Sequence, residues 1–126
     1  MNEPVKLIDL NSALDRLKEG INEAANDLDR DGVIQRFEFT FELVWKTIQE
    51  YAKYKGLEVV SPRDSFRIAS DLEIIENPEV WFDFLKDRNE STHLYDEEQA
   101  KLIFSHMPSF VIQVEKLISN ISKQLS

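Results

Sequence analysis

The sequence predicts an all-α protein, an up-and-down bundle of about five helices forming a single domain over residues 1–126. Apolar residues recur at steps of three and four, and strand-type alternation is absent. The chain holds only 3 Gly and 4 Pro in 126 residues, so the interruptions between periodic segments are few and short. Hydrophobic residues make up 42%, which suits one core and not two.

The first two helices are predicted from one narrow stripe and one broad face. A helix from about residue 5 to about residue 30 carries the stripe Leu7, Leu10, Leu14, Leu17, Ile21, Ala24 and Leu28. "DRDG" then breaks the pattern, and a second helix is expected from about Val33 to Lys55. Gly56 suits the left-handed conformation that closes a helix.

The second helix has apolar residues on two sides. Its main face consists of Ile34, Phe37, Phe41, Val44, Trp45, Ile48 and Ala52. Phe39 and Leu43 fall nearly opposite this face, among charged residues, at about 100° per residue. This placement predicts a second packing surface, against another helix of the bundle or against a partner subunit. The alternative is two isolated surface hydrophobes, which are common.

Cap and proline signals define the remaining helices. Ser61–Pro62 and Asn77–Pro78 each combine a capping side chain with proline at the first helical position. Asp96 followed by Gln99 is a variant of the capping box. It predicts a last helix over about 97–123 with the stripe Leu102, Ile103, Phe110, Val114, Leu117 and Ile121, which Pro108 should kink or interrupt.

Composition limits the function classes. The absence of cysteine excludes disulfides and thiolate zinc sites. No run is long enough to span a bilayer, and "MNEPVKLIDLNS" is not a signal peptide, so a cytoplasmic protein without membrane contact is expected. The carboxylates resemble solvated helix faces, and we predict no metal or cofactor site in this chain.

The charge of the chain argues against nucleic-acid binding over its whole surface. The formal net charge is −9, whereas affinity for RNA or DNA comes mostly from Lys and Arg. RNA contact therefore requires a local basic patch or a basic partner. Arg63 and Arg67, four apart on one helix face, are the candidate phosphate-binding residues, together with Lys86. The alternative is a solvated face balanced by neighbouring aspartates; His106 is assigned no role.

The segment "RNESTHLY", Arg88 to Tyr95, lies where one helix is expected to end and the next to begin. On one ideal helix Asn89 and His93 share a face, but Arg88 and His93 diverge by about 140°. The two converge if the helix loosens near Ser91 or Thr92, if the long arginine swings round, or if two chains face each other. This geometry makes a homodimer attractive.

Arginine and histidine together supply the chemistry needed to cleave RNA without a metal. Histidine moves a proton near neutral pH, and arginine stabilises charge on a phosphate. Asn89 is the supporting residue and Tyr95 offers a phenol. The structural alternative is that the basic side chains complement a helix dipole while Tyr95 packs on Trp81.

The spacing Arg-x4-His-x-Tyr in this segment resembles the signature of HEPN-domain proteins, and more narrowly the toxin partner of minimal nucleotidyltransferases. "DGVIQRFEFTFELVWKTIQEYAKYKG" and "SPRDSFRIA" are similar to the nucleotidyltransferase substrate-binding protein family. The resemblance covers about residues 7–114 and implies a small helical bundle that forms homodimers or higher homo-oligomers and complexes with a minimal nucleotidyltransferase.

The resemblance also implies roles for the motif residues. Arg88 and His93 would be catalytic in a metal-independent endoribonuclease, Asn89 supporting, and Tyr95 the acceptor of AMP from the antitoxin nucleotidyltransferase. ATP and magnesium would be bound by that partner. The alternative function is a non-catalytic subunit that presents a substrate to the nucleotidyltransferase. The match at all four motif positions gives no reason to regard the site as inactive.

Overall fold

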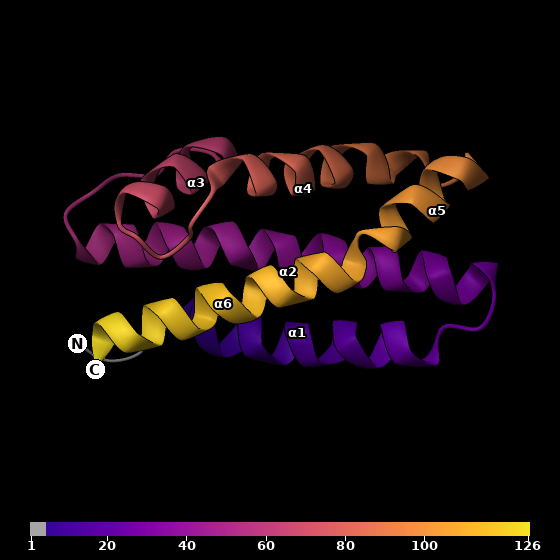
Figure 1. Ribbon diagram of the computed structural model, residues 1–126, viewed down its shortest axis with the longest axis horizontal. Helices are drawn as coiled ribbons and strands as arrows, with labels where there is room; N and C mark the ends of the chain where they lie inside the picture. Colours follow the sequence, from indigo (N-terminus) through magenta and orange to yellow (C-terminus); the bar gives the residue numbers. More distant parts are fainter. Residues whose placement is uncertain (1–4) are drawn as a thin grey trace.

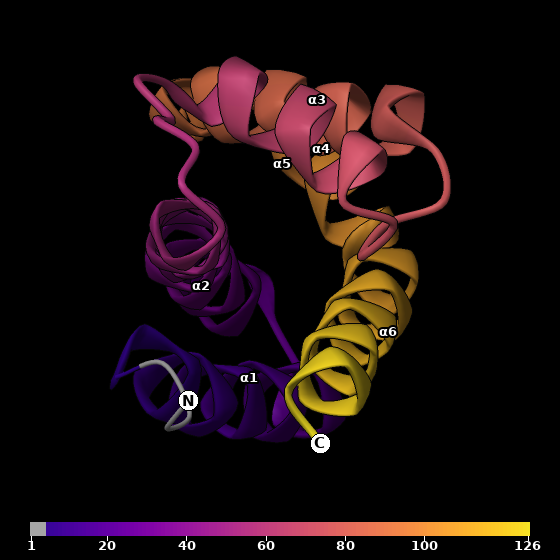
Figure 2. The ribbon, with the colours of Figure 1, turned by 90° about the vertical axis from the view of Figure 1, so that its left-hand side faces the viewer.

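A computed structural model describes residues 5–126, and within this range the chain is helical without strands, as predicted. The helices are α1 (Val5–Glu23), α2 (Asp27–Tyr54), α3 (Pro62–Asp71), α4 (Pro78–Glu90), the 3-10 helix η1 (Ser91–His93), α5 (Glu97–Ser105) and α6 (Met107–Leu125). The long helices alternate in direction along one axis (Figure 1). Seen along that axis, α1, α2, α6 and the layer of α3, α4 and α5 surround a common core (Figure 2).

The boundary between the first two helices differs from the prediction. α1 ends at Glu23 and α2 already begins at Asp27, because the Asn26 side chain accepts a hydrogen bond of 2.8 Å from the Asp29 N–H and caps the new helix. "DRDG" is therefore helical, and Gly32 is accommodated within α2. Leu28 does not continue the apolar stripe of α1, since it is 80% exposed. At the other end of α2, Gly56 has the predicted positive φ of 80°.

The two apolar residues on the polar side of α2 have different environments. Leu43 packs against the core, so the predicted second packing surface is supplied here by the bundle itself. Phe39 remains partly exposed, and the Arg16 guanidinium of α1 lies 5.6 Å from its ring centroid. α2 is thus a central helix that contacts α1 on one side and α3, α4 and α5 on the others.

The predicted helix starts are confirmed by their capping bonds. Ser61 accepts from the Asp64 N–H at 3.1 Å, and Asn77 accepts from the Glu79 N–H at 2.9 Å. The Asp96 carboxylate accepts from the N–H groups of both residues two and three positions ahead, at 3.1 and 3.2 Å. These bonds satisfy N–H groups that have no partner within the helix, and they position α4 and α5 on either side of "RNESTHLY".

Pro108 divides the predicted last helix into α5 and α6, which explains why residues 5–126 contain six α-helices where about five were expected. The break directs Phe110 into a cluster of aromatic rings from α2, α3, α4 and α6. The Phe110 ring centroid lies 4.8 Å from that of Phe37 and 5.1 Å from that of Phe84, both edge-on. The predicted core position of Leu102 is wrong, because this side chain is 52% exposed.

Candidate functional site

The motif "RNESTHLY" lies at a loosened helix end. α4 terminates at Glu90, and Ser91–His93 form one turn of 3-10 helix before α5 begins at Glu97. The expected loosening near Ser91 is therefore present. The tighter turn changes the direction in which the following side chains project, relative to a continued α-helix.

Ser91 holds this turn against the centre of the bundle. It is 3% exposed, and its Oγ lies 2.9 Å from Oε2 of Glu38 on α2 and 2.6 Å from the Arg88 carbonyl oxygen. The hydroxyl has a single hydrogen to share between these two acceptors. The contact with Glu38 joins the motif to the longest helix and limits the freedom of the turn. Sequence reasoning missed this pair, which is 53 residues apart.

His93 and Tyr95 are brought together at the surface. Nδ1 of His93 and the Tyr95 hydroxyl oxygen are 3.0 Å apart, and the rings meet edge to face with 5.6 Å between centroids. Tyr95 is 85% exposed, whereas Trp81 is buried, so the alternative in which Tyr95 packs on Trp81 is wrong. An accessible phenol thus lies in hydrogen-bonding contact with the imidazole of the motif.

Arg88 and Asn89 occupy the last turn of α4. Arg88 is half-buried and Asn89 is exposed. Within residues 5–126 the Arg88 guanidinium forms no ion pair or hydrogen bond, with His93 or with any carboxylate, so its five donors are not engaged. One chain therefore brings His93 and Tyr95 together but does not bring Arg88 into hydrogen-bonding contact with either. The convergence of Arg88 and His93 stays a prediction.

A second histidine contacts the residue that precedes the motif arginine. Nδ1 of His106, at the α5–α6 break, lies 2.8 Å from Oδ2 of Asp87. Asp87 is buried, and burial raises the pKa of its carboxyl; the hydrogen bond and charge of His106 oppose this rise. The pair lines a hollow of about 560 Å³ between α4, α5 and α6. His106, given no role from sequence, thus connects the break at Pro108 to the motif end of α4.

Replacing Asp87 by asparagine is expected to increase the free energy of unfolding at neutral pH. Folding raises the pKa of the Asp87 carboxyl above its ordinary value of 3.8. The protonated carboxyl therefore stabilises the folded protein fully below that value, and this stabilisation is lost as the pH rises through the pKa in the folded state. An asparagine at this position does not ionise, so the variant does not lose this stability as the pH rises. Urea unfolding of both proteins at about pH 7 and about pH 4.5 should show an advantage of Asp87→Asn that shrinks at the lower pH.

The exposed Asp83, one turn away, provides the matched control for this experiment. Asp83→Asn also removes one carboxylate from α4. Because the charge of Asp83 raises the pKa of Asp87 less than burial does, this variant should change the difference between the two pH values much less than Asp87→Asn does. A loss of stability in Asp87→Asn that is equal at both pH values would contradict the prediction. It would mean that the hydrogen bond to His106 outweighs the cost of burying the charge.

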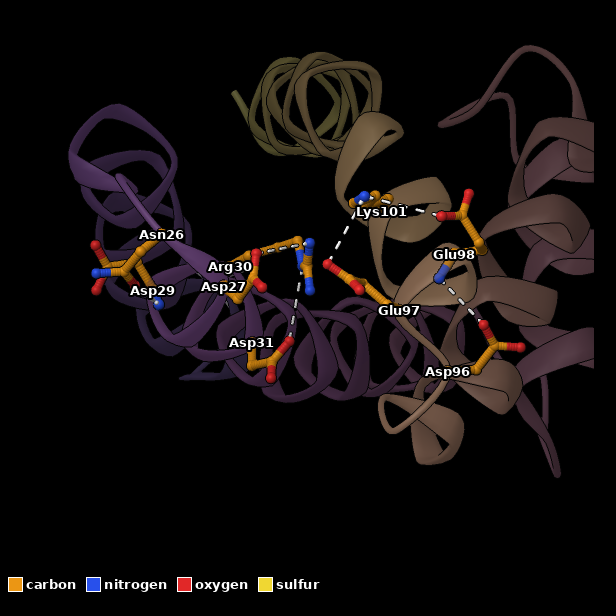
Figure 3. Close-up of polar contacts among 9 residues, drawn as sticks. All are labelled: Asn26, Asp27, Asp29, Arg30, Asp31, Asp96, Glu97, Glu98 and Lys101. Atoms are coloured by element: carbon orange, nitrogen blue, oxygen red, sulfur yellow. Dashed lines mark hydrogen bonds and ion pairs between the residues drawn. The ribbon is translucent and has the colours of Figure 1, made fainter.

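The acidic starts of α2 and α5 lie close to the same end of the bundle (Figure 3). Arg30 of α2 pairs with Asp27 at 3.3 Å, and Lys101 of α5 pairs with Glu97 at 3.7 Å and Glu98 at 3.8 Å. Carboxylates therefore neutralise the basic side chains in this region. The predicted phosphate-binding residues lie elsewhere: Arg63 and Arg67 are exposed on α3, and both stack over Phe82 of α4.

Comparison with known proteins places this geometry in a family. The family model described as "Nucleotidyltransferase substrate binding protein like" matches residues 5–123, nearly the whole chain. The chain belongs to this family. The resemblance drawn from the motif and from the second-helix segment is therefore confirmed at the level of the family.

Individual proteins that are similar to this chain were also found. A curated protein of Haemophilus influenzae, named probable ribonuclease HepT, is 24% identical over 98 residues, which cover 74% of this chain and 67% of that protein. A crystal structure of a Thermus thermophilus protein superposes with a TM-score of 0.83 at 32% identity, covering 87% of this chain and 96% of that one.

A second solved structure supports the fold. A Haemophilus influenzae protein, described as having the fold of a substrate-binding domain of a nucleotidyltransferase, superposes with a TM-score of 0.82 at 22% identity over 92% of this chain and 98% of that chain. The all-α architecture is therefore the fold of that structure. None of the helices in residues 5–126 has the length and apolar character needed to cross a membrane.

Proposed function

We propose that this chain is a toxin-type, metal-independent endoribonuclease that a minimal nucleotidyltransferase binds and silences by adenylylating Tyr95. Family membership supports the link to a nucleotidyltransferase. The curated relative named as a probable ribonuclease supports the activity. The contact between His93 and Tyr95 carries the proposal, because it couples the proton-transfer group directly to the residue that would be modified.

In the proposed cleavage, a ribose 2′-oxygen attacks the adjacent phosphorus and the bond to the 5′-oxygen breaks. The products are a 2′,3′-cyclic phosphate and a 5′-hydroxyl. His93 takes the proton from the 2′-hydroxyl or gives one to the leaving oxygen. Arg88 stabilises the charge that builds on the phosphate oxygens, and Asn89 orients the phosphate or His93. The unengaged guanidinium of Arg88 and the exposed imidazole of His93 suit these roles.

Both groups act on one phosphate only if they converge, and two chains offer a way to achieve this. Arg88 of one protomer and His93 of a second would approach the same phosphate across a homodimer. The long arginine side chain offers the other route within one chain. The exposed position of the η1 turn suits either arrangement, because Thr92 and His93 of this turn are open to solvent.

In the proposed silencing reaction the Tyr95 oxygen attacks the α-phosphorus of ATP. The bond to the β-phosphate breaks, pyrophosphate leaves, and the phenolic proton passes to a base or to water. ATP and its magnesium would be bound by the nucleotidyltransferase. AMP on Tyr95 places a negative phosphodiester and an adenosine at His93 and removes the phenolic proton from their contact. RNA would then be excluded by charge and by bulk.

Tyr95→Phe is expected to abolish AMP transfer to this chain. The purified chain is incubated with its neighbouring nucleotidyltransferase, ATP and Mg²⁺, and modified peptides are mapped by mass spectrometry. Tyr54→Phe is the matched control, since Tyr54 is also exposed, at 54%, whereas Tyr51 is buried. Label that is absent from Tyr95→Phe and retained in Tyr54→Phe supports the proposal. Label on no tyrosine would refute the acceptor assignment.

The acidity of the chain favours a second candidate, a non-catalytic subunit that presents a substrate to a nucleotidyltransferase. The chain has a net charge of −9, so its surface is better suited to binding a basic protein than to binding RNA without a partner. Such a subunit retains its function without the His93 imidazole. A ribonuclease does not, so substitution of His93 separates the two candidates.

A further inference from the structure

Two arginines of α3 share one aromatic ring of α4. The Arg63 guanidinium carbon lies 4.6 Å from the ring centroid of Phe82, and that of Arg67 lies 5.8 Å from it. Attraction between a cation and the ring face restricts both guanidinium groups to the surface of α3 and α4. Both side chains remain exposed. The ring therefore pre-orders two positive charges next to one another, at a place open to solvent.

These two charges have no ion-pair partner among the described residues. Within residues 5–126 neither Arg63 nor Arg67 forms an ion pair, whereas Arg30, Lys46 and Lys101 each contact a carboxylate of a neighbouring turn. Asp64, between the two arginines in sequence, accepts a hydrogen bond from the Val60 N–H and so is engaged at the helix start. A chain of net charge −9 thus leaves two adjacent guanidinium groups available for an external anion.

The exposed side of α4 connects the position of Arg63 and Arg67 with the segment "RNESTHLY". Phe82, Lys86 and Asn89 are spaced four and three apart, so they form one stripe on the helix. From Phe82 to Asn89 this stripe covers about 10 Å at the helical rise, and His93 follows in the η1 turn. Asp83 and Glu90 lie within a turn of Lys86 and partly offset its charge. The arginines are therefore the stronger anion-binding part of the stripe.

We infer that the face formed by Arg63, Arg67, Phe82 and Lys86, here termed the α3–α4 basic face, binds the phosphate backbone of single-stranded RNA. It would hold the strand a few nucleotides away from the phosphate that His93 acts on. This inference rests on the proposed ribonuclease function and adds a substrate-binding surface to it. Guanidinium groups suit this task because their planar forks match phosphate oxygens.

The test measures binding without cleavage. A fluorescent 2′-O-methyl RNA of mixed sequence, about 12 nucleotides long, lacks the nucleophile for cleavage and is titrated with the full chain by fluorescence anisotropy. The double variant Arg63→Gln, Arg67→Gln is expected to bind about tenfold more weakly. Its plot of log affinity against log salt concentration should be shallower by about 1.4, for two lost phosphate contacts.

Arg16→Gln is the matched control. Arg16 also lies over an aromatic ring, Phe39, but on α1 and α2, away from the α3–α4 basic face. It should leave binding within about twofold. A third variant, Phe82→Leu, keeps all positive charges and removes the ring that orders them. It should weaken binding about threefold with an unchanged salt slope, because the number of phosphate contacts is kept.

The outcomes separate this inference from the proposed function. Equal binding by the double variant and by wild type would overturn the inference while leaving the ribonuclease proposal intact. Failure of the wild-type chain to bind the RNA would also overturn it. A double variant that still binds RNA but no longer forms a complex with the nucleotidyltransferase would overturn the inference as well, because the α3–α4 basic face would then bind a protein and not RNA. Binding that is lost as expected, by a chain that cleaves no RNA, would support the inference and refute the ribonuclease proposal.

Discussion

Replacing His93 by alanine is expected to lower the rate of RNA cleavage by a factor of about 10² to 10⁴, the range for loss of a general acid or base. His93 is exposed and its ring contacts the exposed Tyr95, so the substitution removes the imidazole without opening the core. The fold should be retained. Cleavage is measured with purified chain and total RNA, or with a labelled RNA, in the presence of a chelator.

Thr92→Ala is the matched control for this experiment. Thr92 is exposed in the same 3-10 turn, and its hydroxyl makes only a long contact of 3.3 Å to the Asn89 carbonyl oxygen. Its loss should change the rate by less than about twofold. A His93→Ala protein that cleaves as fast as wild type would rule out the proposed mechanism. A folded wild-type chain that cleaves no RNA would favour the substrate-presenting subunit.

Phe110→Ala is expected to lower the free energy of unfolding by about 3–5 kcal/mol, the range for removing a buried aromatic side chain. The Phe110 ring is fully buried and meets Phe37, Trp81 and Phe84 edge-on, so its loss leaves a cavity between α2, α4 and α6. These rings also position α4, which carries the motif. Urea unfolding, followed by circular dichroism, measures the loss.

Two further substitutions make this prediction specific. Phe110→Leu retains much of the volume and should cost less than Phe110→Ala. Ile112→Ala truncates a side chain on the same helix that is 52% exposed, and should change stability by no more than about 0.5 kcal/mol. If Ile112→Ala and Phe110→Ala destabilised the protein equally, the loss would reflect helix propensity and not the aromatic cluster.

Local sequence signals predicted the helix starts but not every helix boundary. Ser61, Asn77 and Asp96 cap helices as expected, because a capping bond involves residues only two or three positions apart. The interpretation of "DRDG" as a break is wrong. The Asn26 cap begins α2 upstream of it, and the exposed Gly32 is followed directly by Val33 and Ile34, which are buried in the core. Tertiary contacts of this kind have no local signature.

The same distinction applies to the candidate site. The sequence pattern around "RNESTHLY" predicted a helix end here and left loosening near Ser91 or Thr92 as one of three ways for Arg88 and His93 to converge; η1 provides the loosening. The contact of Ser91 with Glu38, and that of Asp87 with His106, join residues 53 and 19 positions apart. They depend on how α2 and the α5–α6 break pack against α4. No spacing rule along one helix reveals such pairs.

The position of Phe110 in the last helix has a consequence for biosynthesis. α1 and α2 are joined by a short connection and meet through sequence-near contacts, so this hairpin is able to form while the rest of the chain is still being made. The aromatic cluster around α4 is complete only after α6 has left the ribosome. A nascent chain that still lacks α6 therefore carries all motif residues without the packing that holds α4.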